Sequence, residues 1–316
     1  MIFLILSVSR RTDIPAFYSE WFLNRIKEGY VYVKNPFNAK QISKINIRPD
    51  VVDCIVFWTK DANPLMNYLD ELKDYKYYFQ FTITPYKKDI EPNLRNKSEI
   101  VDTFIELSKR IGKEKVILRY DPILLTDKYT LNYHKAAFSK LCQRVSGYTD
   151  KVIISFLDDY KKVSRNMKEI ELKEMTAEDI YEISDYFSNV AGEYGLKIET
   201  CGEEIDLSKF GIEHGRCVDG ELIEKIVGYK LKNLKRDGNR SACLCHECID
   251  IGQYDTCAHG CLYCYANINK PKAEENYRAH NPKSPLLFGE YEEEYVIERK
   301  DVKSFRLEEG EQISLI

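Results

Sequence analysis

Short apolar runs alternate with amphipathic stretches through the first two hundred residues of the chain. The runs are rich in β-branched and aromatic residues, which is typical of buried parallel strands. They cover residues 2–8, 54–59, 77–83, 115–120, 151–157 and 196–200. Most segments between them have the spacing of apolar residues expected of helices. Six strand–helix units in series therefore predict an α/β fold with a parallel sheet and right-handed crossovers.

Two closures of the sheet fit this pattern, an open doubly wound sheet and a complete or partial barrel. In both, ligands bind at the carboxyl ends of the strands. The polar residues near these ends that we take as candidate cofactor-binding residues are Arg10, Arg11, Thr59, Thr84, Arg119, Ser155 and Glu199. An arginine beside an apolar strand needs a partner, and a carboxylate or phosphate is suitable. The alternative is that these positions are polar because they meet solvent.

The charge balance and the N-terminus exclude several classes of function. The net charge of −4 gives no global basic field, so it does not support a nucleic-acid partner. The opening MIFLILSVSRRTD is too short to span a bilayer, and its arginines follow the apolar run, unlike those of a signal peptide. We therefore expect a cytoplasmic protein with no membrane partner. The sequence also lacks GxGxxG, GxxxxGK[ST] and HExxH, the usual signals of dinucleotide, P-loop and zinc-helix sites.

The ten cysteines change the picture, because eight of them lie between residues 201 and 264. In a reducing compartment, clustered cysteines more often bind metal or do redox work than form disulfides. Cys54 and Cys142 stand apart, in a predicted strand and a predicted helix. We expect these two to be buried packing residues.

One group has the spacing Cys257-x3-Cys261-x2-Cys264, which places three thiolates on one tight loop. Three ligands would leave one iron of a 4Fe–4S cluster without a protein sulfur, and that iron could bind a small molecule. Gly260 lets the backbone turn close to the cluster. Tyr263, just before the last cysteine, could shield the cluster and stack on an adenine.

This loop resembles the signature of the radical S-adenosylmethionine superfamily, which has an aromatic residue before its last cysteine. The string DIGQYDTCAHGCLYCYAN, together with SVSRRTDIPAFYSEWF near the start, is similar to a bacterial family of unknown function, DUF1848. The resemblance covers nearly the whole chain. In the superfamily the cysteine loop usually follows the first strand, whereas here it follows the sixth. The C-terminal segment would therefore have to fold back over the mouth of the barrel.

The resemblance implies a partial (β/α)6 TIM-like barrel over residues 1–202, and a cysteine-rich segment with a C-terminal strap over residues 203–316. It implies that Cys257, Cys261 and Cys264 hold a 4Fe–4S cluster whose open iron chelates S-adenosylmethionine. Reductive cleavage of that cofactor would give a 5′-deoxyadenosyl radical, which acts on an unknown substrate. An electron donor such as flavodoxin or ferredoxin would then be a partner.

A second set of cysteines could hold an auxiliary site. We expect its ligands to be Cys201, Cys217, Cys243 and Cys245, with Cys248 left over. The ACLC pair at 242–245 precedes the radical loop in the resembling family as well. Whether this set binds a second iron–sulfur cluster or zinc stays open at this point.

A rival grouping has nearly zinc-ribbon spacing, Cys245-x2-Cys248-x12-Cys261-x2-Cys264. It leaves Cys243 and Cys257 unexplained. The corresponding alternative function is a non-catalytic iron–sulfur or zinc protein that transfers electrons or binds a ligand.

Overall fold

A computed structural model describes residues 2–157, 166–168, 170–238, 242–299 and 302–306. Its centre is an eight-stranded, all-parallel sheet with the strand order β10-β9-β8-β7-β6-β5-β2-β11. Six of these strands confirm the six predicted runs: β2 (Ile5–Val8), β5 (Cys54–Thr59), β6 (Tyr77–Thr82), β7 (Val116–Ile123), β8 (Lys151–Phe156) and β9 (Lys197–Thr200).

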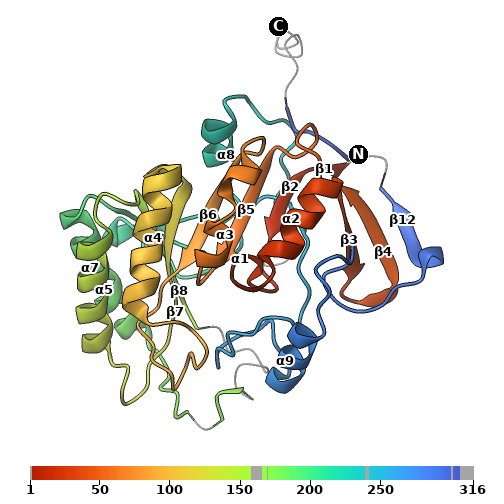
Figure 1. Cartoon of the computed structure of the whole chain (residues 1–316). Helices are drawn as coiled ribbons and strands as arrows, with labels where there is room; N and C mark the ends of the chain where they lie inside the picture. Colours follow the sequence, from red (N-terminus) through yellow and green to blue (C-terminus); the bar gives the residue numbers. More distant parts are fainter. Residues whose placement is uncertain (1, 158–165, 169, 239–241, 300–301, 307–316) are drawn as a thin grey trace, which may run out of the picture.

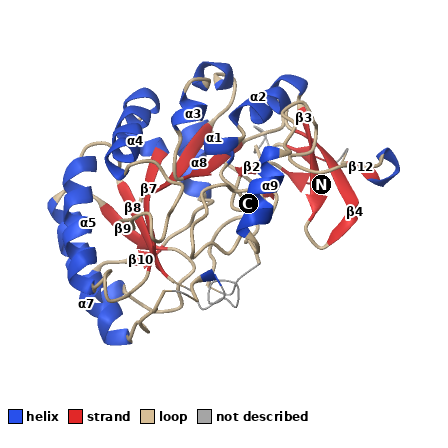
Figure 2. Cartoon of the chain, turned by 60° about the horizontal axis from the view of Figure 1, so that its bottom comes forward, coloured by secondary structure: helices blue, strands red, loops and turns tan. Residues whose placement is uncertain are grey.

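The helices between these strands cover one face of the sheet, as Figure 2 shows for α4, α5 and α7. Alternate strand residues point to this face, where Phe57 and Leu118 pack in one apolar cluster with Phe104 and Phe187 of the helices. A doubly wound sheet would carry helices on both faces, so this arrangement is that of an open or partial barrel. The helices are α1 (Ile14–Phe17), α2 (Ser19–Glu28), α3 (Asn63–Met66), α4 (Lys97–Ile111), α5 (Leu131–Val145) and α7 (Ala177–Glu193).

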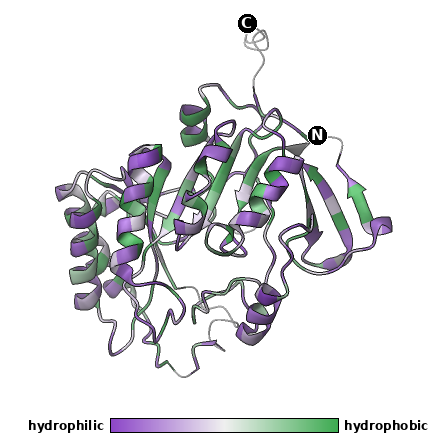
Figure 3. Cartoon of the chain, in the orientation of Figure 1, coloured by the Kyte–Doolittle hydropathy of each residue, from purple (hydrophilic) through white to green (hydrophobic). Residues whose placement is uncertain are grey.

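The inner face of the sheet has a separate apolar cluster. Val56, Tyr78 and Ile117 point inward and pack against Ile223 of α8 (Gly220–Val227). The strands are mostly hydrophobic, whereas the helices have hydrophilic sides (Figure 3). The C-terminal part of the chain therefore completes the core of the barrel from inside.

The two edges of the sheet are formed by strands from the C-terminal part of the chain. β10 (Glu213–His214) pairs with β9, and β11 (Ile249–Asp250) pairs with β2. Within the described residues these two edge strands do not pair with each other, so the sheet stays open. Further pairs join the two ends of the chain (Figure 1): β1 (Ile2–Phe3) with β13 (Val302–Lys303), and β12 (Val296–Glu298) with the hairpin of β3 (Tyr30–Asn35) and β4 (Asn38–Asn46).

Two stretches with helical spacing, residues 16–29 and 63–75, are interrupted, each near a tyrosine. The stretch after Asp13 divides into α1 and α2 at Tyr18, whose hydroxyl donates to the Thr256 carbonyl at 2.5 Å. The stretch from Asn63 divides into α3 and a 3-10 turn, Leu69–Leu72, at Tyr68. Most apolar positions are still buried in both stretches, among them Trp21, Phe22, Leu65 and Leu72, because each short helix keeps its inward side. Among the described residues, no helix is both long enough and apolar enough to cross a membrane.

One carboxylate fastens the C-terminal segment to the end of the first barrel strand. Asp250 accepts hydrogen bonds from the hydroxyls of Ser7 at 2.7 Å and Ser9 at 2.5 Å. It also accepts from the backbone N–H groups of Arg10 at 2.7 Å and Gly252 at 2.9 Å. Since the carboxylate is buried, all four donors depend on it.

We predict that Asp250→Ala lowers the free energy of unfolding by about 3 kcal/mol, because it leaves buried donors without an acceptor. The loss should appear in urea unfolding, together with faster proteolysis between residues 203 and 270. Asp250→Asn keeps one acceptor oxygen, so its free energy of unfolding should lie between those of Asp250→Ala and the unaltered protein. An unchanged urea midpoint for Asp250→Ala would contradict this role.

Candidate functional site

Three cysteines from distant parts of the chain meet on the inner side of the sheet. Cys201 directly follows β9, Cys217 lies between β10 and α8, and Cys245 precedes β11. Their sulfurs all lie within 4.8 Å of one another. The Cys201 and Cys217 sulfurs are 2.8 Å apart, and the Cys217 N–H donates to the Cys245 sulfur at 3.1 Å. This group could bind a metal ion or a cluster.

Cys243 lies beside this group. A hydrogen bond from the Cys245 thiol lowers the pKa of Cys243 to about 6. Bonds from Cys201 and Cys217 in turn lower the pKa of Cys245 to about 7. The structure thus brings together the four cysteines expected for the auxiliary site, and their role as ligands stays a prediction. Cys248 instead accepts from the Arg10 guanidinium at 3.3 Å.

Arg119 holds the thiol of Cys217 from the strand side. Its guanidinium donates to the Cys217 sulfur at 2.7 Å and to the Gln80 side-chain oxygen at 3.3 Å. It also forms a two-pronged ion pair with Asp121. The partners of this arginine, expected to be a carboxylate or phosphate, are therefore a carboxylate and a thiol of the protein itself.

The loop 257–264 lies over the carboxyl ends of neighbouring strands. Two hydrogen bonds join it to the loop that follows β6. The Leu262 N–H donates to the Ile90 carbonyl at 3.0 Å, and the Asn93 side chain donates to the Ala258 carbonyl at 2.8 Å. On the β2 side, a ring nitrogen of His259 lies 2.8 Å from the Asp13 carboxylate, which also caps α1. The loop therefore lies where a C-terminal segment that folds back over the strand ends was expected.

Burial raises the pKa values of all three thiols in this loop, that of Cys257 well above its ordinary range and that of Cys261 to about 12. A metal must therefore replace the protons for these sulfurs to act as thiolates. Within the described part of the chain they do not form as tight a group as Cys201, Cys217 and Cys245. Sulfurs around one tetrahedral ion are about 3.8 Å apart, given metal–sulfur bonds of about 2.3 Å, whereas a 4Fe–4S cluster spreads them over different irons.

The rival zinc-ribbon grouping is not assembled. Cys245 belongs to the apolar cluster on the inner face of the sheet, with Cys201 and Cys217. Cys261 and Cys264 belong to another cluster, formed with Tyr86 and neighbouring side chains.

The side chain of Tyr263 is buried and points from the cysteine loop toward the segment that follows β6. Its hydroxyl donates to the buried carboxylate of Glu91, and its ring lies 5.4 Å from the Lys60 ammonium and 5.8 Å from the ring of Tyr86. Stacking on an adenine stays a prediction. Glu91 was not among the residues expected from the sequence, because nothing in its spacing marks it. Lys60 directly follows a strand, so the strand-end rule could have found it.

Most of the other expected cofactor-binding residues bind protein groups in this structure. Thr59 donates to Asp13 at 2.7 Å, and Thr84 donates to Glu91 at 2.8 Å. Arg10 pairs with Asp237 and Asp250, and Arg11 contacts Gly252 and Tyr254. Glu199 pairs with Lys151 and Lys197. Ser155 is half-buried near the end of β8. Their role toward a cofactor is not tested by these contacts.

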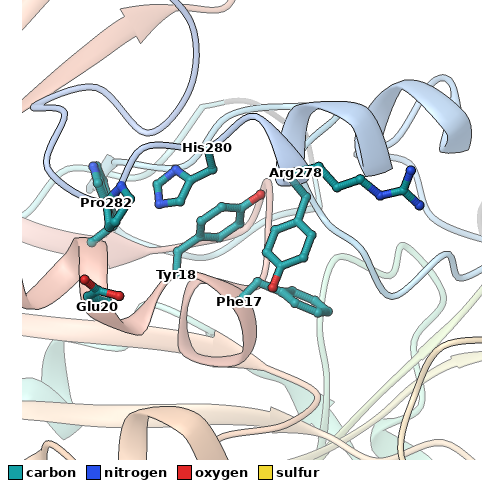
Figure 4. Close-up of a pocket in the computed structure, with 8 residues that line it drawn as sticks. Phe17, Tyr18, Glu20, Arg278, His280 and Pro282 are labelled. Atoms are coloured by element: carbon teal, nitrogen blue, oxygen red, sulfur yellow. The ribbon is translucent and has the colours of Figure 1, made fainter.

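A cavity of about 320 Å³ lies outside both cysteine groups, between the first two helices and α9 (Lys270–Arg278). Figure 4 shows its aromatic side chains and the His280 ring close to Tyr18. It is lined by Phe17, Tyr18, Glu20, Trp21, Tyr277, Arg278, His280 and Pro282. Tyr18 forms the connection to the cysteine loop through its bond to Thr256.

We predict that Cys243 in the reduced, metal-free protein is alkylated readily at neutral pH. Since its pKa is about 6, the rate should rise between about pH 5 and pH 7 and then level off. Mass spectrometry of iodoacetamide-treated protein measures this, with Cys54, which is fully buried, as the unreactive reference. A rate that still climbs above pH 8, as for an ordinary thiol, would be the contrary result.

Cys201→Ala should remove metal from the inner cysteine group while the loop 257–264 keeps its own. We expect lower metal content by elemental analysis and faster proteolysis between residues 203 and 270, because metal ligation stabilises the folded segment. Cys142→Ala is the matched control, a buried cysteine in α5. Full metal content with an unchanged digestion pattern would show that Cys201 is only a packing residue.

Comparison with known proteins gives a family and little more. The curated proteins contain no match. Among solved structures, the crystal structure of a "putative alpha-L-fucosidase" from Bacteroides thetaiotaomicron VPI-5482 matches 57% of this chain and 74% of its own, at 11% identity and a TM-score of 0.25. That likeness is too weak to carry an argument. The family model described as "Domain of unknown function (DUF1848)" matches residues 5–266, so the chain belongs to the DUF1848 family.

Proposed function

We propose that this protein is a radical S-adenosylmethionine enzyme whose 4Fe–4S cluster is held by Cys257, Cys261 and Cys264. The observation that carries the proposal is the position of the cysteine loop, which the loops after β2 and β6 bind at the carboxyl ends of the strands. In parallel barrels this is the end at which cofactors and substrates meet.

The donor set fits such a cluster. Three thiols are soft ligands, and a metal core would replace the protons that burial otherwise keeps on them. The Lys60 ammonium lowers the pKa values of Cys261 and Cys264, opposing the larger effect of burial, so it favours the thiolate forms. When bound, the cluster would supply the electron that cleaves S-adenosylmethionine to methionine and a 5′-deoxyadenosyl radical.

The residues of the chain orient the loop for this task. The Asn267 side chain donates to the Cys257 carbonyl at 2.7 Å, and the Ala266 N–H donates to the Cys264 sulfur at 3.3 Å. Hydrogen bonds to ligand sulfurs are one of the means by which proteins set the reduction potential of a cluster. Tyr263 of the loop and the expected strand-end residues would bind the cofactor and an unidentified substrate. The strand-end residues are Arg10, Arg11, Thr59, Thr84, Arg119, Ser155 and Glu199.

The same proposal includes an auxiliary iron–sulfur cluster at Cys201, Cys217, Cys243 and Cys245, with flavodoxin or ferredoxin as electron donor. One observation favours a second candidate, a non-catalytic zinc protein. The sulfurs of Cys201, Cys217 and Cys245 all lie within 4.8 Å of one another, which suits a single tetrahedral ion. Metal analysis separates the two, because zinc gives a colourless protein without sulfide.

We expect anaerobically reconstituted protein with dithionite to convert S-adenosylmethionine into 5′-deoxyadenosine and methionine. Cys257→Ala should abolish this cleavage, because its loop would lose one of three cluster ligands. Cys54→Ala, in β5, is the matched control and should keep it. Chromatography with mass spectrometry measures the products. A preparation with stoichiometric zinc and no 5′-deoxyadenosine would sink the proposal.

A further inference from the structure

Two lysines converge on one buried carboxylate beneath the cysteine loop. The Lys60 ammonium, at the end of β5, lies 2.8 Å from one oxygen of Glu91. Lys97, the first residue of α4, pairs with the other oxygen. Thr84 and Tyr263 donate to the same carboxylate. Glu91 therefore accepts hydrogen bonds from Thr84, Lys97 and Tyr263 and forms an ion pair with Lys60, and burial leaves it only 1% exposed.

The charges of this cluster do not cancel. Burial alone would raise the pKa of Glu91, but Lys60 and Lys97 overcome that effect and lower it to about 2, so Glu91 is ionised. Asp121 also acts on Lys60 electrostatically, but it already forms the ion pair with Arg119. Lys60, Lys97 and Arg119 thus face two carboxylates. Lys97 keeps 29% of its side chain exposed to solvent, whereas the Lys60 nitrogen is buried.

A surplus buried cation is costly unless an anion faces it. The Lys60 nitrogen is enclosed by the protein, and its contact with Glu91 does not have hydrogen-bond geometry, so its donors are not satisfied. The surplus charge and the open donors both indicate that a negative group belongs beside this ammonium.

The loop between Cys261 and Cys264 lies next to this charge. Leu262 binds the carbonyl of Ile90, the residue before Glu91. Tyr263 binds Glu91 itself, and the Lys60 ammonium lies 5.4 Å from the Tyr263 ring. The lysine is thus fixed relative to the two cysteines that flank Leu262 and Tyr263.

We propose that Lys60, fixed by Glu91, is a positioning residue that supplies the counter-charge of the cluster and raises its reduction potential. This inference rests on the proposed function. On reduction the cluster gains one electron from an external donor, and its net charge becomes more negative by one. A fixed cation at short range in a weakly screened interior stabilises the reduced form more than the oxidised form.

The test is the midpoint potential of the cluster, followed by electron paramagnetic resonance during redox titration of the anaerobically reconstituted full chain. Lys60→Met should make the potential more negative by at least about 59 mV, which corresponds to a tenfold change in the equilibrium constant of a one-electron reduction. Lys60→Arg keeps the charge and is the matched control, with a smaller shift. Lys60→Gln removes the charge but keeps a polar side chain, and it should shift the potential in the same negative direction as Lys60→Met.

The second neutral variant keeps the test decisive. If Lys60→Met does not assemble a cluster, the shift of Lys60→Gln decides instead. Potentials of the neutral variants within a few millivolts of the unaltered protein would overturn the counter-charge. Failure of the proposed function looks different, because the unaltered protein would then either contain no iron–sulfur cluster in the loop or form no 5′-deoxyadenosine from S-adenosylmethionine.

Discussion

The arrangement of both cysteine groups depends on the bond between Asp250 and the end of β2. The barrel strands precede most of the cysteines in the sequence, so the chain must return to the strand ends to place any metal there. Asp250 ties this returning segment to Ser7, Ser9 and Arg10. Cys245 and Cys248 lie just before this tie and Cys257 lies just after it. One carboxylate therefore sets the register of the inner group and of the outer loop.

The sequence was sufficient for the features that depend on repeated local patterns. The six strands were predictable because buried parallel strands are continuously apolar. A possible metal site among the cysteines was predictable because eight of the ten crowd into residues 201–264. The interrupted helices were not predictable from periodicity. Tyr18 leaves the helix to reach Thr256, and that partner is known only once the C-terminal segment is in place. The hairpin of β3 and β4 was missed as well.

The polar residues near the strand ends show more clearly what the sequence could not predict. The rule that functional groups collect at these ends selected Thr84 and Arg119. Both are buried, but Thr84 follows the end of β6 whereas Arg119 lies within β7. Their partners could not be inferred, since Glu91 and Cys217 come from separate loops. Periodicity says which side of a strand faces inward. It does not say whether an inward polar group will meet a ligand or another part of the same protein.

The pairing of the two ends of the chain also has a consequence for biosynthesis. The 243 residues that separate Ser7 from Asp250 take about 12 s to synthesise at about 20 residues per second. During that time β2 has a neighbour on one side only, and its other edge awaits β11. The strand–helix units can form while the ribosome is still translating, whereas the cysteine segment docks only near the end. Metal delivered to the nascent chain would thus meet a barrel that is already built.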